Sequence, residues 1–405
     1  MNTKYHTRLT SENSRIVVLD YLRVFAVIVL FFFHLGMVWV PEWNFHFKQE
    51  TQWFWLQHIL LISSPWRMGL LWFIAGSSLY FMQQKYGLAF LLTRRSNAIL
   101  LPLLTGIYCI VPIQLFVEMT QKGAIDTSVG YFFIQFYFGA TDYFNGFSAG
   151  IWHHVDVNHL WFLRSLWRFT LLLIIFHLPL KWVRDSLGNF NSVWLLLLVS
   201  ISLFASQIEE SDLQRDIYGF ACLVWGYLFG GQAQFWGWLR DRRGALIAFA
   251  TILTLSYEVG FKVVGYQPDN LPIKTIALWS YYLAKVFSVF AILALADKVF
   301  VKANPAVVKA NGYVFPLYVI HQSVIIGVSY FITNTALSAP TAMALSAVVS
   351  MLLCFLLLLL CEYSAVTGVF LGKKAPASHW LSGKTAQMII TAFTLPLALR
   401  LVGLI

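Results

Sequence analysis

Three ionisable residues lie inside the first long apolar stretch of the chain, residues 16–40: Asp20, Arg23 and His34. Arg23 and His34 are eleven residues apart, so a helix would place them within ~20° of one face and ~16 Å apart along its axis. An arginine near the centre of a membrane helix costs about 2.5–3.5 kcal/mol, so such residues usually face a protein interior and serve a function. We interpret the pair as part of a polar track through a helical bundle. The alternative is that Asp20 and Arg23, one turn apart, form a structural ion pair and that His34 is a packing residue.

Further polar residues recur within apolar segments. Arg164 and Arg168 are one helical turn apart, so we expect their common face to contact protein or water rather than lipid. Lys285 and His321 also lie inside apolar stretches, and the position of His321 near the middle of its segment favours an interior role. Glu258 is better interpreted as a structural partner for a basic group than as a catalytic residue.

The composition excludes a soluble domain. Hydrophobic residues make up 59% of the 405 residues and charged residues only 11%, and the mean hydropathy is +0.69. The sequence therefore predicts an all-α, polytopic integral membrane bundle in a lipid bilayer. The first apolar stretch has no cleavage site after it and is expected to be retained as a span. The four cysteines fall in predicted spans, which argues against a disulfide framework and a zinc cluster. The net charge of +10 needs no nucleic-acid partner, because the placement of the basic residues explains it.

About eleven membrane-spanning helices are predicted. Their approximate ranges are 16–40, 66–83, 98–118, 159–179, 192–208, 217–236, 245–263, 276–297, 313–333, 341–362 and 387–405. With these spans most lysines and arginines fall on one side, and the other side receives only Lys48, Lys122, Arg215, Lys262 and Lys274. The positive-inside rule then places the N-terminus in the cytoplasm and the C-terminus outside.

The two long loops predicted on the outer side, 41–65 and 119–158, are rich in aromatic, His and Asn residues. Trp152, His153, His154, Asp156 and Asn158 are closely spaced there. An interfacial aromatic belt explains this composition. A surface that contacts a sugar explains it equally well, because aromatic faces and amide or imidazole edges suit a polyhydroxylated ligand. The rings of adjacent His153 and His154 would diverge, so no zinc site is expected.

On the inner side, Arg94 and Arg95 precede the third predicted span. An arginine pair beside a helix start can bind phosphate through its guanidinium groups. The signal is weak alone, because topology would also place arginines there.

An ordered set of motifs resembles the membrane-bound acyltransferase 3 family, and within it the branch of glucan biosynthesis protein C, which succinylates periplasmic glucans. The set runs over residues 15–375 and comprises Leu19-Asp20-Tyr21-Leu22-Arg23 with His34, Arg67-Met68 leading to Trp72-Phe73-Ile74-Ala75-Gly76, Arg95 to Pro102, His159-Leu160-Trp161-Phe162-Leu163, Tyr318-Val319-Ile320-His321, and Cys361-Glu362-Tyr363 through Lys373. Two departures are Ala75, where the family usually has Ser, and an additional predicted helix after residue 384. The domain expectation is an acyltransferase 3-like transmembrane domain over 1–375 and an additional C-terminal helix within 376–405.

The resemblance implies a membrane enzyme of the bacterial inner membrane. Its reaction would move an acyl group, acetyl or succinyl, from cytoplasmic acyl-CoA to a hydroxyl of an extracytoplasmic glycan. No metal or bound cofactor is implied, and acyl-CoA is the donor co-substrate. The oligomeric state stays open.

The expected catalytic residues are His34, Arg23 and His321. His34 would act as general base or as a transient acyl carrier, and His321 would orient His34 or donate to the tetrahedral intermediate. The expected donor- or substrate-binding residues are Asp20, Arg67, Arg94, Arg95, Trp161, Arg164, Arg168, Lys285 and Tyr318. Arg164 and Arg168 are not part of the family pattern; we infer that with Lys285 they favour an anionic acyl group. The alternative function is a multi-span transporter or flippase for a glycan or an anionic molecule, although no inverted repeat is visible.

Overall fold

The described residues form helices joined by loops and contain no strand, which confirms the predicted all-α class. The structure, a computed structural model, describes residues 2–147, 153–186, 190–266, 270–376 and 378–401. The helices are α1 (Asn2–Gly36), α2 (Phe54–Lys85), α3 (Leu88–Thr105), η1 (Gly106–Ile110), α4 (Pro112–Gln121), α5 (Val129–Phe138), η2 (Thr141–Phe144), η3 (Asn158–Leu160), α6 (Trp161–Ile175), α7 (His177–Ser186), α8 (Ser192–Ala205), α9 (Ser211–Phe229), α10 (Ala233–Asp241), α11 (Arg243–Tyr266), α12 (Leu271–Val299), α13 (Pro305–Asn311), α14 (Val314–Thr333), α15 (Ala339–Tyr363), α16 (Ala365–Phe370), η4 (Trp380–Ser382) and α17 (Lys384–Leu401).

Seven segments within the described residues are long and apolar enough to cross a membrane. They are Val17–Gly36, Phe54–Lys85, Leu91–Gln121, Arg243–Gly265, Leu271–Val299, Val314–Thr333 and Ala339–Tyr363. The segment Asn158–Ile175 and α7 qualify only as a pair, and they are bent by 70° relative to each other. The multi-pass membrane class is thus supported, whereas the count of eleven is not confirmed. The predicted spans at 192–208, 217–236 and 387–405 stay predictions, and residues 402–405 lie outside the described part.

The chain divides into two compact units. The first contains residues 1–26, 58–88 and 171–311, and the second contains 27–57, 89–170 and 312–405. The predicted domain boundary at residue 375 follows the extent of the family motifs and stays a prediction.

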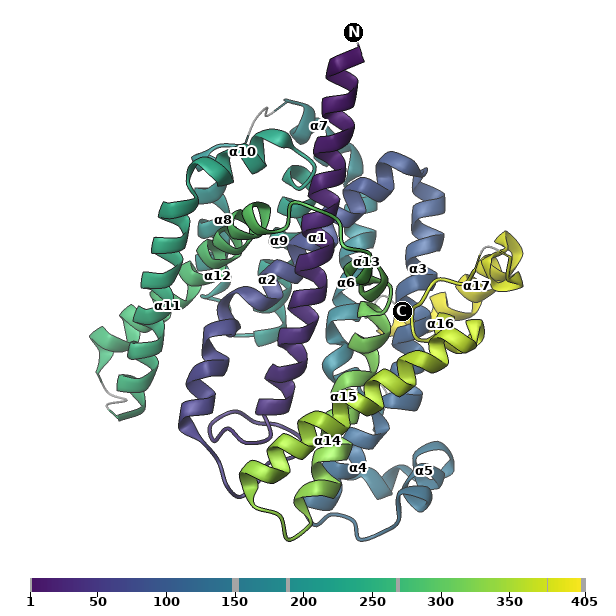
Figure 1. The fold of residues 1–405 in the computed structure, drawn as a ribbon. Helices are drawn as coiled ribbons and strands as arrows, with labels where there is room; N and C mark the ends of the chain where they lie inside the picture. Colours follow the sequence, from purple (N-terminus) through teal and green to yellow (C-terminus); the bar gives the residue numbers. More distant parts are fainter. Residues whose placement is uncertain (1, 148–152, 187–189, 267–269, 377, 402–405) are drawn as a thin grey trace. The chain divides into compact units, whose positions relative to one another are not determined.

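In the first unit, α11 and α12 pack along each other, and α8 and α10 also contact α12 (Figure 1). Glycines bring α2 and α9 into close contact. A Cβ built on Gly76 would lie 1.8 Å from the Leu223 carbonyl oxygen, and one built on Gly226 would lie 2.0 Å from the Phe73 carbonyl oxygen. The small residues near the end of the second predicted span therefore permit close helix packing.

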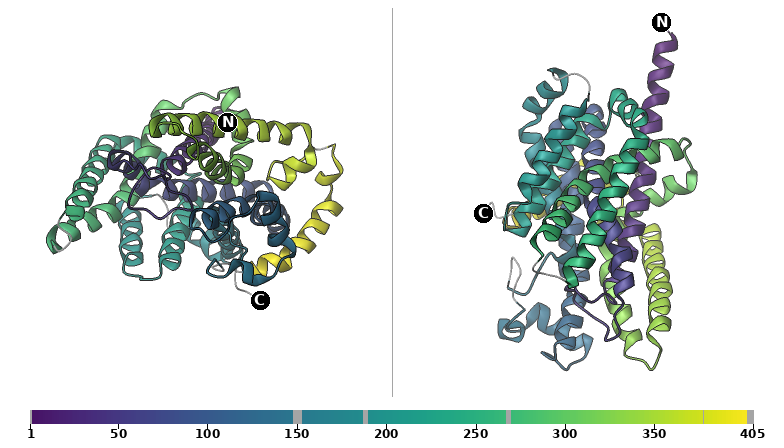
Figure 2. Two further views of the ribbon diagram at one scale, coloured as in Figure 1. Left: turned by 90° about the horizontal axis from the view of Figure 1, so that it is seen from below. Right: turned by 90° about the vertical axis from the view of Figure 1, so that its left-hand side faces the viewer.

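In the second unit, α14 packs against α15 and α4, and these pairs can be followed in Figures 1 and 2. The π-helical turn η1 joins α3 to α4, and it contacts both α14 and η3. Gly106 in η1 gives room for this contact, because a Cβ there would lie 2.2 Å from Cδ1 of Leu160 and that side chain would have to move. This packing positions η3 beside α14, and the candidate site is built at that junction.

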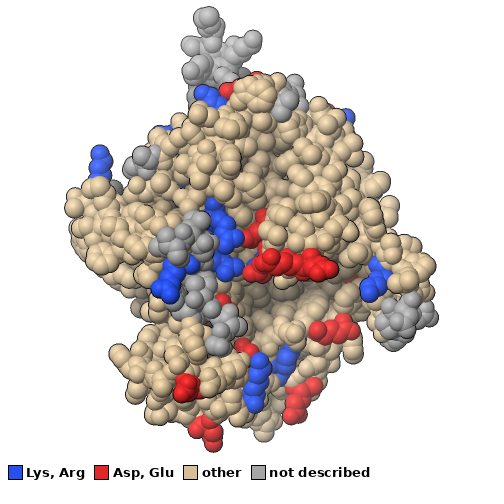
Figure 3. Space-filling view, turned by 180° about the vertical axis from the view of Figure 1, so that it is seen from behind, with Lys and Arg blue, Asp and Glu red and all other residues tan. Residues whose placement is uncertain are grey.

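Exposed apolar residues dominate the outer faces of several helices. In α15, Leu352, Phe355 and Leu356 are exposed, as are Phe249, Ile252 and Leu255 in α11. Most of the surface visible in Figure 3 carries neither basic nor acidic side chains. Such faces suit contact with lipid, in agreement with the membrane class.

Candidate active site

Two histidines that are far apart in the sequence meet in the second unit. Nδ1 of His34, in the last turns of α1, lies 2.8 Å from Nε2 of His321 in α14. Their ring centroids are 5.0 Å apart. His321 is completely buried, whereas His34 is partly exposed. The buried imidazole is therefore placed to hold the more accessible one.

The hydrogen bonds assign the protons on both rings. Nδ1 of His321 lies 2.7 Å from the carbonyl oxygen of Tyr318, and because a carbonyl only accepts, this nitrogen must carry a proton. In the neutral ring Nε2 of His321 is then an acceptor, so Nδ1 of His34 donates to it. Neutral His34 consequently has its unprotonated nitrogen at Nε2, which is the atom able to take a proton or to attack a carbonyl carbon.

His159 extends this histidine cluster from η3. Its Nε2 lies 3.1 Å from the carbonyl oxygen of Val319, so Nε2 donates, and its Nδ1 accepts from the amide of Gln114 at 3.0 Å. The rings of His159 and His321 meet edge to face, with centroids 5.5 Å apart. The hydroxyl of Tyr318 donates to the carbonyl of His159, which fixes η3 against α14.

Gln114 in α4 joins the polar groups of this cluster. Its amide nitrogen also donates to the hydroxyl of Ser323 at 2.6 Å, and its oxygen accepts from the Gln322 amide at 3.0 Å. Gln114 has no exposed surface. A buried amide with all these bonds rigidifies its neighbours, because any rearrangement would leave a polar group unsatisfied. Gln114 was not predicted as a site residue, and a single glutamine within an apolar segment gives little signal in the sequence.

Arg23 and Asp20 lie in the first unit, in the part of α1 that belongs to it. Arg23 donates to Asp20 at 3.1 Å, to the side-chain oxygen of Asn311 at 2.8 Å and to the Ser78 hydroxyl at 2.7 Å. Asn311 in turn donates to Asp20 at 2.7 Å. The ion pair between Asp20 and Arg23, which is the alternative interpretation of the sequence, is therefore present. Asn311 and Ser78, which the sequence did not indicate, complete the set of partners that hold the guanidinium.

Arg67 and Lys285 also belong to the first unit. Arg67 is buried and donates to Ser63 one turn earlier in α2. The ammonium group of Lys285 lies over the ring of Tyr218, with its nitrogen 3.9 Å from the centroid, and near the rings of Tyr281 and Tyr282. Cation–π contacts thus stabilise the charge of Lys285 in this interior.

The Glu258 carboxylate, also in the first unit, pairs with His58 at 2.9 Å between α11 and α2. This contact fits the structural role inferred for Glu258.

The remaining predicted arginines lie in the second unit, on α3 and α6. Trp167 donates to the Ser96 hydroxyl at 3.1 Å, which joins these two helices. Arg95 directly precedes Ser96 and Arg168 directly follows Trp167, so the segments carrying the arginine pairs meet. Arg94, Arg95, Arg164, Arg168 and Trp161 are all partly buried.

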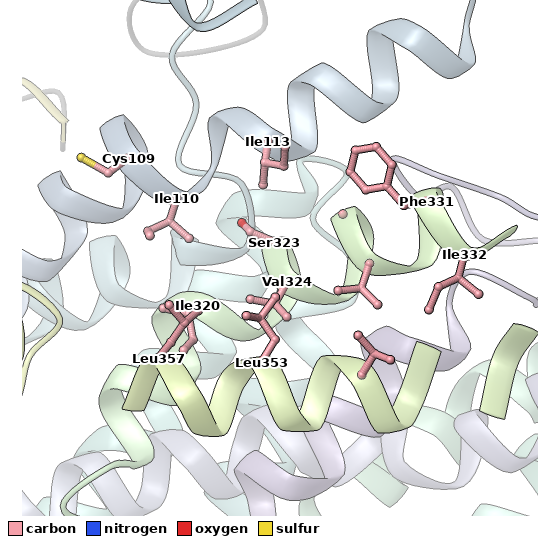
Figure 4. Close-up of a pocket in the computed structure, with 13 residues that line it drawn as sticks. Cys109, Ile110, Ile113, Ile320, Ser323, Val324, Phe331, Ile332, Leu353 and Leu357 are labelled. Carbon is pink, nitrogen blue, oxygen red and sulfur yellow. The ribbon is translucent and has the colours of Figure 1, made fainter. Parts of the chain in front are cut away.

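A large apolar cavity of about 430 Å³ lies among η1, α4, α14 and α15 (Figure 4). In the close-up, Ile110 and Ile113 face Leu353 and Leu357 across it. Ser323, which also bonds to Gln114, lies in its wall. Because the rest of the wall offers few polar groups, the cavity suits a hydrocarbon chain better than a sugar.

Residues 16–359 of the chain match the family described as an acyltransferase domain. The chain belongs to the acyltransferase 3 family. The match covers most of the 405 residues and contains every residue of the histidine cluster. It confirms that this membrane protein is an acyltransferase. Comparisons with curated proteins and with solved structures give no match.

Proposed function

We propose that this acyltransferase moves an acyl group from cytoplasmic acyl-CoA to a hydroxyl of an extracytoplasmic glycan, with Nε2 of His34 as the reacting nitrogen. The observation that carries this proposal is the chain of hydrogen bonds from His34 through His321 to the carbonyl oxygen of Tyr318. These bonds assign the basic nitrogen to Nε2 on the partly exposed ring of His34. The buried ring of His321 holds that ring in place. Group transfer to a hydroxyl needs this kind of oriented base.

In the proposed reaction, Nε2 of His34 takes the proton from the acceptor hydroxyl as its oxygen attacks the thioester carbon. The tetrahedral intermediate then breaks its C–S bond, and the CoA sulfur receives the proton from His34. The products are the glycan ester and free CoA thiol. Positive charge on His34 is stabilised through its Nδ1–H bond to His321, whose own ring is fixed by Tyr318. A covalent acyl-His34 intermediate would use the same nitrogen.

The arginines of α3 and α6 support binding of an anionic donor. Guanidinium groups bind phosphates in bidentate fashion, so we assign the CoA phosphates to Arg94 and Arg95. Arg164 and Arg168 would then favour a dicarboxylic acyl group such as succinyl. The proposal includes the cytoplasmic N-terminus, the bacterial inner membrane and the branch of glucan biosynthesis protein C.

Mass spectrometry of cell-envelope glycans from cells with and without the protein tests the proposed function. We expect glycans that are heavier by one acyl group only where the protein is present. In purified protein, release of CoA thiol should require both acyl-CoA and glycan. Movement of labelled glycan or anion across the membrane without consumption of thioester would instead support the transporter alternative.

A further inference from the structure

A second cavity of about 140 Å³, which we call the polar cavity, lies in the second unit, and five polar side chains line it together with apolar ones. Its wall is formed by the loop after α1, by η1, α4 and α5, by the segment after η2, and by the segment from His154 to Asn158 at the start of η3. The polar and aromatic residues that line it include His46, Glu118, Phe136, His154, Asp156 and Asn158.

Hydrogen bonds between three of these residues order one side of the cavity. His46 lies between Glu118 and Asn158, with its Nδ1 2.5 Å from the carboxylate and its Nε2 2.8 Å from the Asn158 amide oxygen. The other carboxylate oxygen of Glu118 pairs with Lys122. A carboxylate has about four lone-pair sites, so both oxygens can accept further hydrogen bonds from a ligand.

The chemistry of the wall matches a polyhydroxylated ring. Two carboxylates and the amide of Asn158 supply acceptors and donors for neighbouring hydroxyls. Nδ1 of His154, which has no hydrogen-bond partner among the described residues, adds one more position, and the aromatic rings of Phe136 and Phe147 offer apolar faces. His154 is held in place by its bond to the Phe136 carbonyl at 2.9 Å and by stacking on Phe144, with centroids 4.0 Å apart. The polar groups are thus fixed before a ligand arrives.

Two connections join this cavity to the histidine cluster, one through a contact between two rings and one between neighbouring residues of the chain. Phe45, which precedes His46, stacks on the ring of His34 with centroids 6.4 Å apart. Asn158, which bonds to His46, directly precedes His159 of the cluster. Asn158 has a φ of 46°, in the left-handed region that Asn adopts more readily than most side chains. This backbone conformation places the Asn158 amide in the cavity wall and the His159 ring against α14.

We propose that this cavity is the acceptor subsite and binds one pyranose ring of the glycan, with Glu118 and Asp156 accepting hydrogen bonds from its hydroxyls. The proposal rests on the proposed function for its acceptor class. It assigns binding to Glu118 and Asp156 and leaves proton transfer to His34. Loss of either carboxylate should therefore weaken sugar binding and raise the acceptor KM without changing the KM for acyl-CoA.

Saturation-transfer difference NMR on the full chain in nanodiscs tests the subsite directly. The probes are cellobiose, lactose and chitobiose, with glycerol as an acyclic polyol. We expect at least one disaccharide, and not glycerol, to bind the wild-type protein. Glu118→Gln and Asp156→Asn should each weaken binding about tenfold, the effect of removing a charged hydrogen-bond acceptor. Asp156→Asn can keep the bond from the Val157 amide, so its loss of binding would not reflect a disordered loop.

Asp126→Asn is the matched control, because Asp126 is an exposed acid of the same region that does not line the cavity. It should bind like the wild type. The subsite is overturned if no disaccharide binds, or if both carboxylate variants bind as tightly as this control. His34→Ala should still bind the sugar. Binding that depends on Glu118 in a protein that consumes no acyl-CoA would keep the subsite and refute the proposed function, so the two failures are distinguishable.

Discussion

The imidazole of His321 bonds at both of its nitrogens, to the carbonyl oxygen of Tyr318 and to His34. These two contacts decide which nitrogen of His34 is basic. The sequence suggested an interior position for His321, because the residue lies in the middle of an apolar segment. It could not indicate the tautomers, since these depend on which carbonyl oxygen and which second ring the fold brings within hydrogen-bond distance.

The hydrogen bonds of the single residue Gln114 are expected to stabilise the fold. Gln114→Leu would leave Nδ1 of His159 and the Gln322 amide without their present partner in a buried environment. Each unsatisfied buried group costs about 1–3 kcal/mol, so we expect a clear fall in the melting temperature in detergent.

Ser346→Ala is the control for this substitution. Ser346 is equally buried, but its hydroxyl has no hydrogen-bond partner among the described residues. Its removal should leave the melting temperature unchanged or raise it. Equal losses in the two variants would show that the bonds of Gln114 contribute nothing specific.

At the scale of elements, the contact between α2 and α9 depends on glycine. Gly76→Val would place side-chain atoms against the backbone of Leu223, where even a Cβ lies 1.8 Å from an oxygen. Overpacking of this kind typically costs about 1–3 kcal/mol, and because backbone cannot move aside as a flexible side chain does, we expect a lower melting temperature.

Gly244 in α11 provides the comparison, because a Cβ there would meet nothing within 4 Å. Gly244→Ala should be neutral or slightly stabilising, since Ala favours helix over Gly. A Gly76→Val protein as stable as Gly244→Ala would refute close packing of α2 on α9.

The loop after α1, which carries His46 to the polar cavity, is held by Lys48. The ammonium group of Lys48 donates to the carbonyls of Met37 and Val40. The backbone N–H and carbonyl of Lys48 form hydrogen bonds with the side-chain amide of Gln121 at the end of α4. Burial lowers the pKa of Lys48 from 10.5 to about 8. Between these two values the unfolded chain binds more protons at this residue than the folded one, so its contribution to stability rises with pH.

Melting temperatures of the wild type and of Lys48→Met, measured from pH 7 to pH 10, test this dependence. Relative to the variant, the wild type should gain stability as the pH rises above about 8. A difference that stays constant, or that falls, would contradict the lowered pKa of Lys48.

At the scale of the whole molecule, composition and motif order predicted the membrane class and the acyltransferase family. The membrane class depends on apolar content summed over many residues, such as those of Val314–Thr333. The family depends on the order of many short motifs along the chain. Contacts between distant segments were harder to predict. His46 and Glu118, or Arg23 and Asn311, meet only after folding, and nothing in their local sequence indicates the partner. The number of spans is a further case, because apolar content predicts a span at 192–208, whereas the helix there, α8, is shorter than the seven segments long enough to cross a membrane.

The rate of acyl transfer by purified His34→Ala, compared with the wild type and with His321→Ala, tests whether His34 is the reacting base. A positioned general base contributes about 10²–10⁴-fold, so we expect a loss of that size for His34→Ala. His321→Ala should also lose turnover, with an unchanged KM for acyl-CoA, because His321 orients the reacting ring without contacting the donor. The control Ser329→Ala, a buried residue of the same helix, should keep normal turnover. Near wild-type turnover in His34→Ala would show that His34 is not the reacting base.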